Sequence, residues 1–90
     1  MNMLRNICIP QDYVKHLIEK YGAENQPVVC IEELSELQKE LCKYMRGKGD
    51  KAHITEEITH VLITTSVIIE LLNIDKEEIQ KNVIQKIEQY

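Results

Sequence analysis

Apolar residues recur at every third or fourth position along most of the chain, which is the spacing of one face of an α-helix. Four segments show this pattern: residues 10–22, 25–46, 52–72 and 75–90. The boundaries fit, since Pro10 suits a first helical turn, Gly22 can end a helix and Asn25 can act as an N-cap. The pattern predicts four helices joined by short loops, one of which is RGKGD at 46–50.

The third segment is ambiguous by composition. From Ile58 to Ile69 it contains no Asp, Glu, Lys or Arg and is rich in β-branched residues, which favour strands. Its length favours a helix, because a run of about 20 residues without a turn signal exceeds a typical strand, and the chain supplies no partner strands. We therefore expect a third helix, which Asn73 can close.

The stripes and short connections also predict how the helices pack. The second segment carries its stripe at Cys30, Leu34, Leu37 and Leu41, and the fourth at Ile79, Val83, Ile87 and Tyr90. Asp75 and Glu78 resemble a capping box at the start of the fourth helix. The expected fold is all-α: one domain over residues 1–90, an antiparallel bundle of about four helices completed by oligomerisation.

The amino-acid composition explains why oligomerisation is expected, and it limits the classes of molecule that the protein is expected to bind. A chain of 90 residues without Phe or Trp must build its core from Ile, Leu and Val, and a homodimer or homotetramer would enlarge that core. The net charge of −4 argues against nucleic acid as a partner. No apolar run is long enough for a membrane span and no signal peptide is recognisable, so we expect a cytoplasmic protein.

The three cysteines, Cys8, Cys30 and Cys42, are odd in number and lack a Cys-x-x-Cys spacing. We expect reduced thiols and neither a disulfide framework nor a zinc site.

Two pairs of polar residues give the chain its candidate chemistry. Glu33 and Glu36 lie three positions apart on the second helix, and so do Glu57 and His60 on the third, so each pair points to one side of its helix. Glu33 and Glu57 border apolar stripes, where unpaired carboxylates are costly and repel one another. A divalent cation would resolve both problems. Glu32, Glu40 and Glu56 are interpreted as ordinary exposed acids.

The stretch ENQPVVCIEELSELQKELCKYMRGKG followed by EEITHVLI resembles the MazG-like, all-α nucleoside triphosphate pyrophosphohydrolases, particularly the short single-domain forms of bacteria and phages. The resemblance covers residues 21–72 well and the final helix loosely. That family carries Glu-x-x-Glu on one helix and Glu-x-x-Asp on the next. It cleaves a nucleoside triphosphate to the monophosphate and pyrophosphate with Mg²⁺.

The resemblance implies roles for particular residues. Glu33, Glu36 and Glu57 would be catalytic metal ligands for Mg²⁺, with a nucleoside triphosphate as substrate. Lys86 resembles a lysine that meets phosphate, and Gln26 resembles a substrate-side residue of the phage-type members. Lys43 is a further candidate for substrate binding.

The departure from the family pattern is His60, which stands where the family has Asp. A neutral nitrogen suits Mn²⁺, Zn²⁺ or Fe²⁺ better than Mg²⁺. His60 can therefore ligate a softer metal such as Mn²⁺, stand outside the ligand set, or mark a catalytically silent helical interaction protein. A further alternative is a di-iron carboxylate bundle, because Glu57-x-x-His60 has the spacing of such sites.

Overall fold

Four α-helices and no strand make up residues 9–89, the part of the chain that the computed structural model describes. They are α1 (Gln11–Tyr21), α2 (Gln26–Met45), α3 (Lys51–Leu71) and α4 (Lys76–Gln89). The all-α prediction is confirmed, the ambiguous third segment included, and the boundaries predicted for the helices lie within one or two residues of those observed. Within this range, no helix has the combination of length and apolar character needed to cross a membrane.

Local interactions explain where the helices begin and end. The side chain of Asp50 accepts a 2.8 Å hydrogen bond from the backbone N–H of Ala52 and so caps α3. Gly22 ends α1 with a positive φ of 83°, which costs glycine little. Asn25 precedes α2 as predicted but does not cap it, because its Nδ2 donates backwards to the carbonyl of Tyr21 at 3.4 Å.

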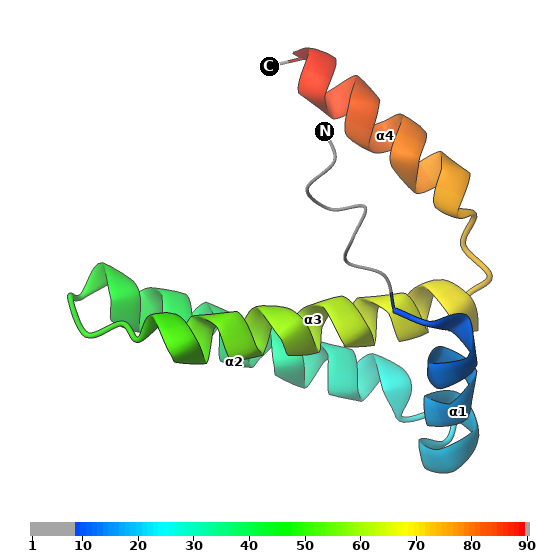
Figure 1. The fold of residues 1–90 in the computed structure, drawn as a ribbon, viewed down its shortest axis with the longest axis horizontal. Coiled ribbons are helices and arrows are strands. Elements are labelled where there is room, and N and C mark those ends of the chain that lie inside the picture. Colours follow the sequence, from blue (N-terminus) through cyan, green and yellow to red (C-terminus); the bar gives the residue numbers. More distant parts are fainter. Residues whose placement is uncertain (1–8, 90) are drawn as a thin grey trace.

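The two longest helices, α2 and α3, form an antiparallel hairpin closed by the predicted 46–50 loop (Figure 1). Side-chain pairs fix the direction. His60 lies beside Glu33, whereas the earlier residue His53 lies beside the later residue Glu40. Helix α1 packs mainly on α3, near the end of the hairpin away from this loop. Three helices thus meet at that end, and this arrangement positions the site described below.

The core of the described chain is small. Its buried apolar residues are Val14, Cys30 and Val67, one from each of the first three helices. Its buried polar residues are Gln26, Glu40 and Thr64. A core of this size leaves many large apolar side chains at the surface of the single chain, and leucines of the predicted α2 stripe are among them, with Leu34 46% and Leu41 44% exposed.

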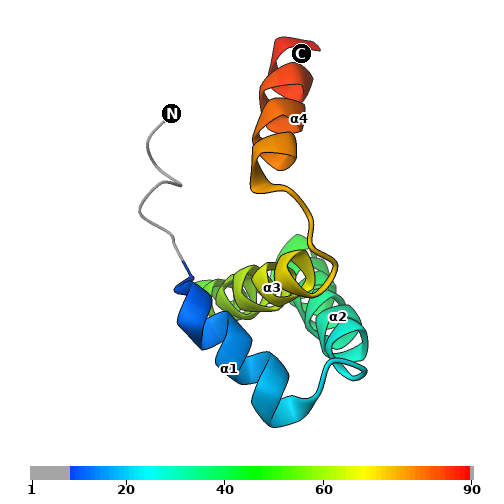
Figure 2. The ribbon, with the colours of Figure 1, turned by 90° about the vertical axis from the view of Figure 1, so that its right-hand side faces the viewer.

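Helix α4 leads away from the other three helices, and only its start lies beside them (Figures 1 and 2). Lys76 Nζ donates a 3.3 Å hydrogen bond to Gln11 Oε1, and Lys76, Ile79 and Gln80 line a small cavity with residues of α1 and α3. Ile79, Val83 and Ile87 are 36%, 45% and 56% exposed, so the prediction of a buried stripe on α4 is wrong for the single chain. Tyr90, the last member of that stripe, lies outside the described residues. The turn at Asn73, with a φ of 53°, redirects the chain after α3, which a sequence pattern cannot reveal.

Candidate functional site

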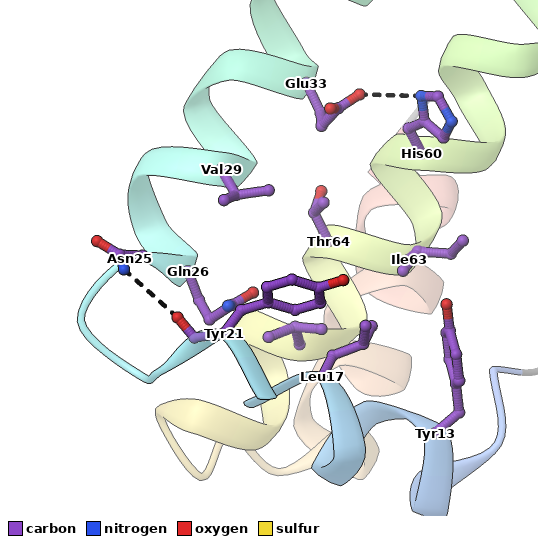
Figure 3. A pocket seen from close by; sticks show the side chains of 11 residues that line it. Tyr13, Leu17, Tyr21, Asn25, Gln26, Val29, Glu33, His60, Ile63 and Thr64 are labelled. Atoms are coloured by element: carbon purple, nitrogen blue, oxygen red, sulfur yellow. Dashed lines mark hydrogen bonds and ion pairs between the residues drawn. The ribbon is translucent and has the colours of Figure 1, made fainter. Parts of the chain in front are cut away.

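Glu33, Glu57 and His60 meet between the two helices of the hairpin, near its middle (Figure 3 shows the Glu33–His60 pair). Each offers one ligand atom, and the three atoms lie within 4.8 Å of one another. His60 Nδ1 is 3.0 Å from Glu33 Oε2 and 3.7 Å from Glu57 Oε2. Both distances allow an ion pair when His60 is protonated, and the pair with Glu33 is the closer one. The structure therefore brings Glu33 of the first predicted pair together with both members of the second pair.

Glu57 is the least satisfied member of this cluster. Its side chain is only 17% exposed, and its Oε2 is buried and accepts no hydrogen bond from any described residue. A buried acceptor without a donor costs about 1–3 kcal/mol, and more when it is charged. The cluster therefore holds a carboxylate oxygen with free binding capacity beside a second carboxylate and an imidazole.

The chemistry of these three side chains fits a divalent cation. Two carboxylate oxygens and one imidazole nitrogen make a mixed ligand set, which transition metals such as Mn²⁺, Fe²⁺ and Zn²⁺ accept more readily than Mg²⁺ does. Such an ion would supply the partner that Glu57 Oε2 lacks and would offset the repulsion between the two carboxylates.

Glu36, the fourth member of the predicted metal set, is not part of the cluster. It is exposed, while Glu33 is partly buried. A step of three residues on a helix turns the side chain by about 60°, and here that rotation carries Glu36 away from α3. Its predicted role as a ligand gains no support from this geometry.

The two lysines predicted to bind substrate also lie apart from the cluster. Lys43 is near the opposite end of α2 from Gln26, and its Nζ lies 3.1 Å from Glu40 Oε2. Lys86 is exposed on α4, the helix that leads away from the hairpin. Among the residues that the structure describes, no lysine or arginine lines the pocket next to the cluster.

That pocket is a cavity of about 650 Å³ between α1, α2 and α3, open at one side, with Glu33 and His60 in its wall (Figure 3). Its other lining residues are mostly apolar or aromatic: Tyr13, Leu17, Tyr21, Asn25, Gln26, Val29, Ile63, Thr64 and Val67. The pocket is large enough for a small organic ligand, and its few polar groups can orient one.

Gln26 is the predicted substrate-side residue that the structure does bring to the pocket. It is only 5% exposed, and its Nε2 donates a 3.2 Å hydrogen bond to the carbonyl of Gly22. This bond fixes the amide at the pocket wall. Tyr13 and Tyr21 of α1 also line the pocket, and the sequence did not identify them as site residues. The only signal in the sequence for such a role is their position on an amphipathic helix.

A second polar cluster lies near the loop of the hairpin and corrects one prediction. Glu40, expected to be exposed, is buried at 8% exposure; Lys43 Nζ is 3.1 Å from its Oε2 and His53 Nδ1 is 3.8 Å from its Oε1. The prediction was wrong because Glu40 follows Glu33 by seven residues, which returns a helix to nearly the same face. Glu32 and Glu56 are exposed as predicted.

Comparisons with family models, with curated protein sequences and with solved structures find no match for this chain. The site is therefore interpreted from its own residues.

Proposed function

We propose that this protein is a metal-dependent nucleoside triphosphate pyrophosphohydrolase, which converts a nucleoside triphosphate to the monophosphate and pyrophosphate. The observation that supports it best is the cluster of Glu33, Glu57 and His60 in and beside the wall of an apolar pocket. The resemblance of residues 21–72 to the MazG-like family supports the same function. A cation site next to a pocket for a flat organic group is the combination that a nucleotide requires.

The proposal gives the residues of the site distinct roles. Glu33, Glu57 and His60 would hold the divalent ion, whose chemistry, when it is bound, would be to neutralise phosphate charge and to activate a water molecule. Tyr13 and Tyr21 offer aromatic surfaces to a nucleobase.

Two further roles concern protons and orientation. A cluster carboxylate accepts the proton of the attacking water. The buried amide of Gln26 supplies polar groups that orient the nucleoside.

His60 modifies the choice of metal in this proposal. Mg²⁺ is the family's cofactor, but it favours oxygen ligands, whereas an imidazole nitrogen in the set raises the affinity for Mn²⁺ relative to Mg²⁺. We therefore propose Mn²⁺ as the more effective cofactor, with Mg²⁺ as a weaker one.

A second candidate function rests on the short distance between His60 and Glu33. At 3.0 Å, a protonated His60 can itself offset the charge of the carboxylates without any metal. The protein would then be a catalytically silent helical interaction protein. The two functions differ in one respect that can be measured: only the first requires Glu57 Oε2 to bind a cation.

The test is to incubate the full chain with the standard ribonucleoside and deoxyribonucleoside triphosphates in Mn²⁺ and, separately, in Mg²⁺. Pyrophosphate and the monophosphate are the expected products, with faster release in Mn²⁺. Glu57→Gln should lose the activity, and Glu56→Gln, an exposed neighbour, should keep it. Absence of pyrophosphate with every combination of nucleotide and metal would refute the enzymatic function and favour the silent protein.

A further inference from the structure

Two buried polar side chains of the pocket wall, Gln26 of α2 and Thr64 of α3, share one property (Figure 3). Each turns a hydrogen-bond donor away from the pocket, to a backbone carbonyl of its own neighbourhood. Gln26 Nε2 donates to the carbonyl of Gly22 at 3.2 Å. Thr64 Oγ1 donates to the carbonyl of Val61 at 3.3 Å. A side chain engaged in this way offers chiefly its oxygen lone pairs to a ligand.

The contact with Gly22 fixes the orientation of the Gln26 amide. A reversed amide would bring Oε1 against the carbonyl oxygen of Gly22, with no proton between the two acceptors. No described group donates to Oε1, and it is not among the described buried atoms that lack a partner, so it keeps accessible surface. The amide nitrogen carries two N–H groups. Gln26 therefore presents an acceptor to the pocket and keeps one further donor.

The Thr64 hydroxyl presents an acceptor alone. It has a single hydrogen, which is used in the bond to the Val61 carbonyl, as is common for threonine inside a helix. Thr65, the next residue, donates to the same carbonyl at 2.7 Å but does not line the pocket. Thr64 thus differs from its neighbour in one respect: its lone pairs face a ligand.

The rest of the wall adds acceptors more than donors. The carboxylate of Glu33 can only accept while it is ionised. At the rim, Asn25 Nδ2 donates to the carbonyl of Tyr21 at 3.4 Å. The hydroxyl groups of Tyr13 and Tyr21 can donate or accept, so they do not discriminate between ligands. A ligand that brings N–H groups to Gln26 and Thr64 therefore suits the wall better than one that brings oxygen atoms.

We propose that this pocket selects nucleobases with an amino group at C4 of a pyrimidine or C6 of a purine over bases with a carbonyl oxygen there. The favoured bases are cytosine and adenine. The inference rests on the proposed function, because it takes the pocket to hold the base of a nucleotide. One N–H of the amino group bonds to Gln26 Oε1 and the other to Thr64 Oγ1. The adjacent ring nitrogen accepts from the remaining N–H of Gln26.

Uracil and hypoxanthine reverse this edge, because they carry a carbonyl oxygen and a ring N–H. Gln26 alone would tolerate both kinds of edge, since an amide presents a donor and an acceptor. Thr64 makes the difference. The carbonyl oxygen would lie against Oγ1, and the hydroxyl could donate to it only by leaving the Val61 carbonyl. Either outcome loses a hydrogen bond at a buried group, which lowers affinity about tenfold.

Ring size does not decide the choice. The cavity of about 650 Å³ accommodates a purine as well as a pyrimidine. Tyr13 and Tyr21 are 45% and 54% exposed, so either can offer its face to a base that enters from the open side. The edge of such a base then meets Gln26 and Thr64, and its amino or carbonyl group determines the fit.

The first test compares substrates that differ at this edge. The kcat/KM for pyrophosphate release is measured in Mn²⁺ with CTP against UTP, and with ATP against inosine triphosphate. We expect about a tenfold higher value for the amino-bearing member of each pair. Equal values within each pair, or higher values for UTP and inosine triphosphate, would overturn the inference while leaving the hydrolytic function in place.

The second test reads binding without chemistry. The full chain, free of metal, is titrated by calorimetry with CMP against UMP and with AMP against IMP. Tighter binding of CMP and AMP is expected, and it would support the base selection even if no triphosphate were hydrolysed. Equal affinities within the pairs, or no binding of any of the four, would overturn the inference, whereas absence of pyrophosphate in the first test refutes only the proposed function.

The role of Thr64 is tested by two variants and a control. Thr64→Val removes the hydroxyl at nearly constant shape, so the ratio of CMP to UMP affinity should fall toward one. Thr64→Ser keeps the hydroxyl and should keep the ratio. Thr65→Val is the matched control, because the Thr65 hydroxyl shares the same carbonyl outside the pocket, and it should behave as the parent does.

The ratio separates selection from folding, since a general loss of structure lowers the affinity for both nucleotides. Helical circular dichroism is recorded for each variant. A Thr64→Val protein that keeps the full preference for CMP would overturn the inference, and so would a Thr65→Val protein that loses the preference to the same extent.

Discussion

Replacing Glu57 by Gln tests whether this carboxylate is kept for a cation. Two unit charges 4.8 Å apart repel by about 3.5 kcal/mol at an effective dielectric constant of ~20, and Glu57 and Glu33 lie within that distance. When His60 is protonated, its charge offsets part of this repulsion. Glu57→Gln keeps the shape of the side chain and removes the charge from an oxygen that has no hydrogen-bond donor. We therefore expect the metal-free variant to gain about 1 kcal/mol of folding stability.

Metal should stabilise the parent protein much more than the Glu57→Gln variant. At a Mn²⁺ concentration 100 times Kd, binding to the folded state stabilises the parent by about 2.7 kcal/mol. For a chain of this length, each kcal/mol corresponds to a change in Tm of about 4–8 °C, so Mn²⁺ should raise the Tm of the parent by roughly 10–20 °C. Glu57→Gln should lose most of that shift, because the cluster then has one charged ligand fewer.

The assay is thermal unfolding followed by circular dichroism, with and without Mn²⁺, at one fixed protein concentration because oligomerisation also affects Tm. Glu56→Gln is the control, since Glu56 is the exposed neighbour and should behave as the parent does. A metal-free Glu57→Gln protein that melts several degrees below the parent would show that Glu57 acts as a structural partner of His60. A full Mn²⁺ shift in that variant would equally refute the reasoning.

Four further substitutions test separate parts of the account. Glu40→Gln should destabilise the chain by about 1–3 kcal/mol in urea unfolding, because Glu40 is buried with cationic partners. Glu36→Gln should keep the Mn²⁺ shift in Tm, because Glu36 lies outside the cluster. His60→Asp should raise pyrophosphate release in Mg²⁺ relative to Mn²⁺, since the ligand set becomes all oxygen. Gln26→Leu should raise KM more than it lowers kcat, because it removes a polar group from the pocket wall.

The helices were predictable because their signals are local. Periodic apolar residues, Gly22 and Asp75 mark positions that the structure confirms to within a residue. The pairing of α2 with α3 also followed from sequence, since a loop of five residues forces two long helices to lie antiparallel. These features depend on residues that are close together in the sequence, so they can be predicted from the sequence alone.

The site was predictable only where helix geometry alone decided it. Glu33, Glu57 and His60 converge because the hairpin brings the two faces together. Whether Glu36 or Glu40 faces α3 depends on the rotation of α2 about its axis. Tertiary packing sets that rotation, and the sequence pattern allowed more than one solution because apolar residues occupy most of the circumference of α2.

The position of α4 was not predictable for a related reason. Its apolar stripe predicted burial, but a stripe does not identify the surface that covers it, and among the described residues only the start of α4 lies beside the other helices. Leu34 and Leu41 of α2 show the same property, since they are exposed on a helix whose pattern predicted them to be buried. The completion of this core by association stays a prediction.

The most direct measurement for the central claim is electron paramagnetic resonance of Mn²⁺ bound to the full chain labelled with ¹⁵N-histidine. The account predicts a bound Mn²⁺ that shows hyperfine coupling to one histidine nitrogen. The coupling should disappear in His60→Ala and persist in His53→Ala, the histidine of the second cluster. Free Mn²⁺ only, or bound Mn²⁺ whose nitrogen coupling survives in His60→Ala, would contradict the assignment of Glu33, Glu57 and His60 as the metal site.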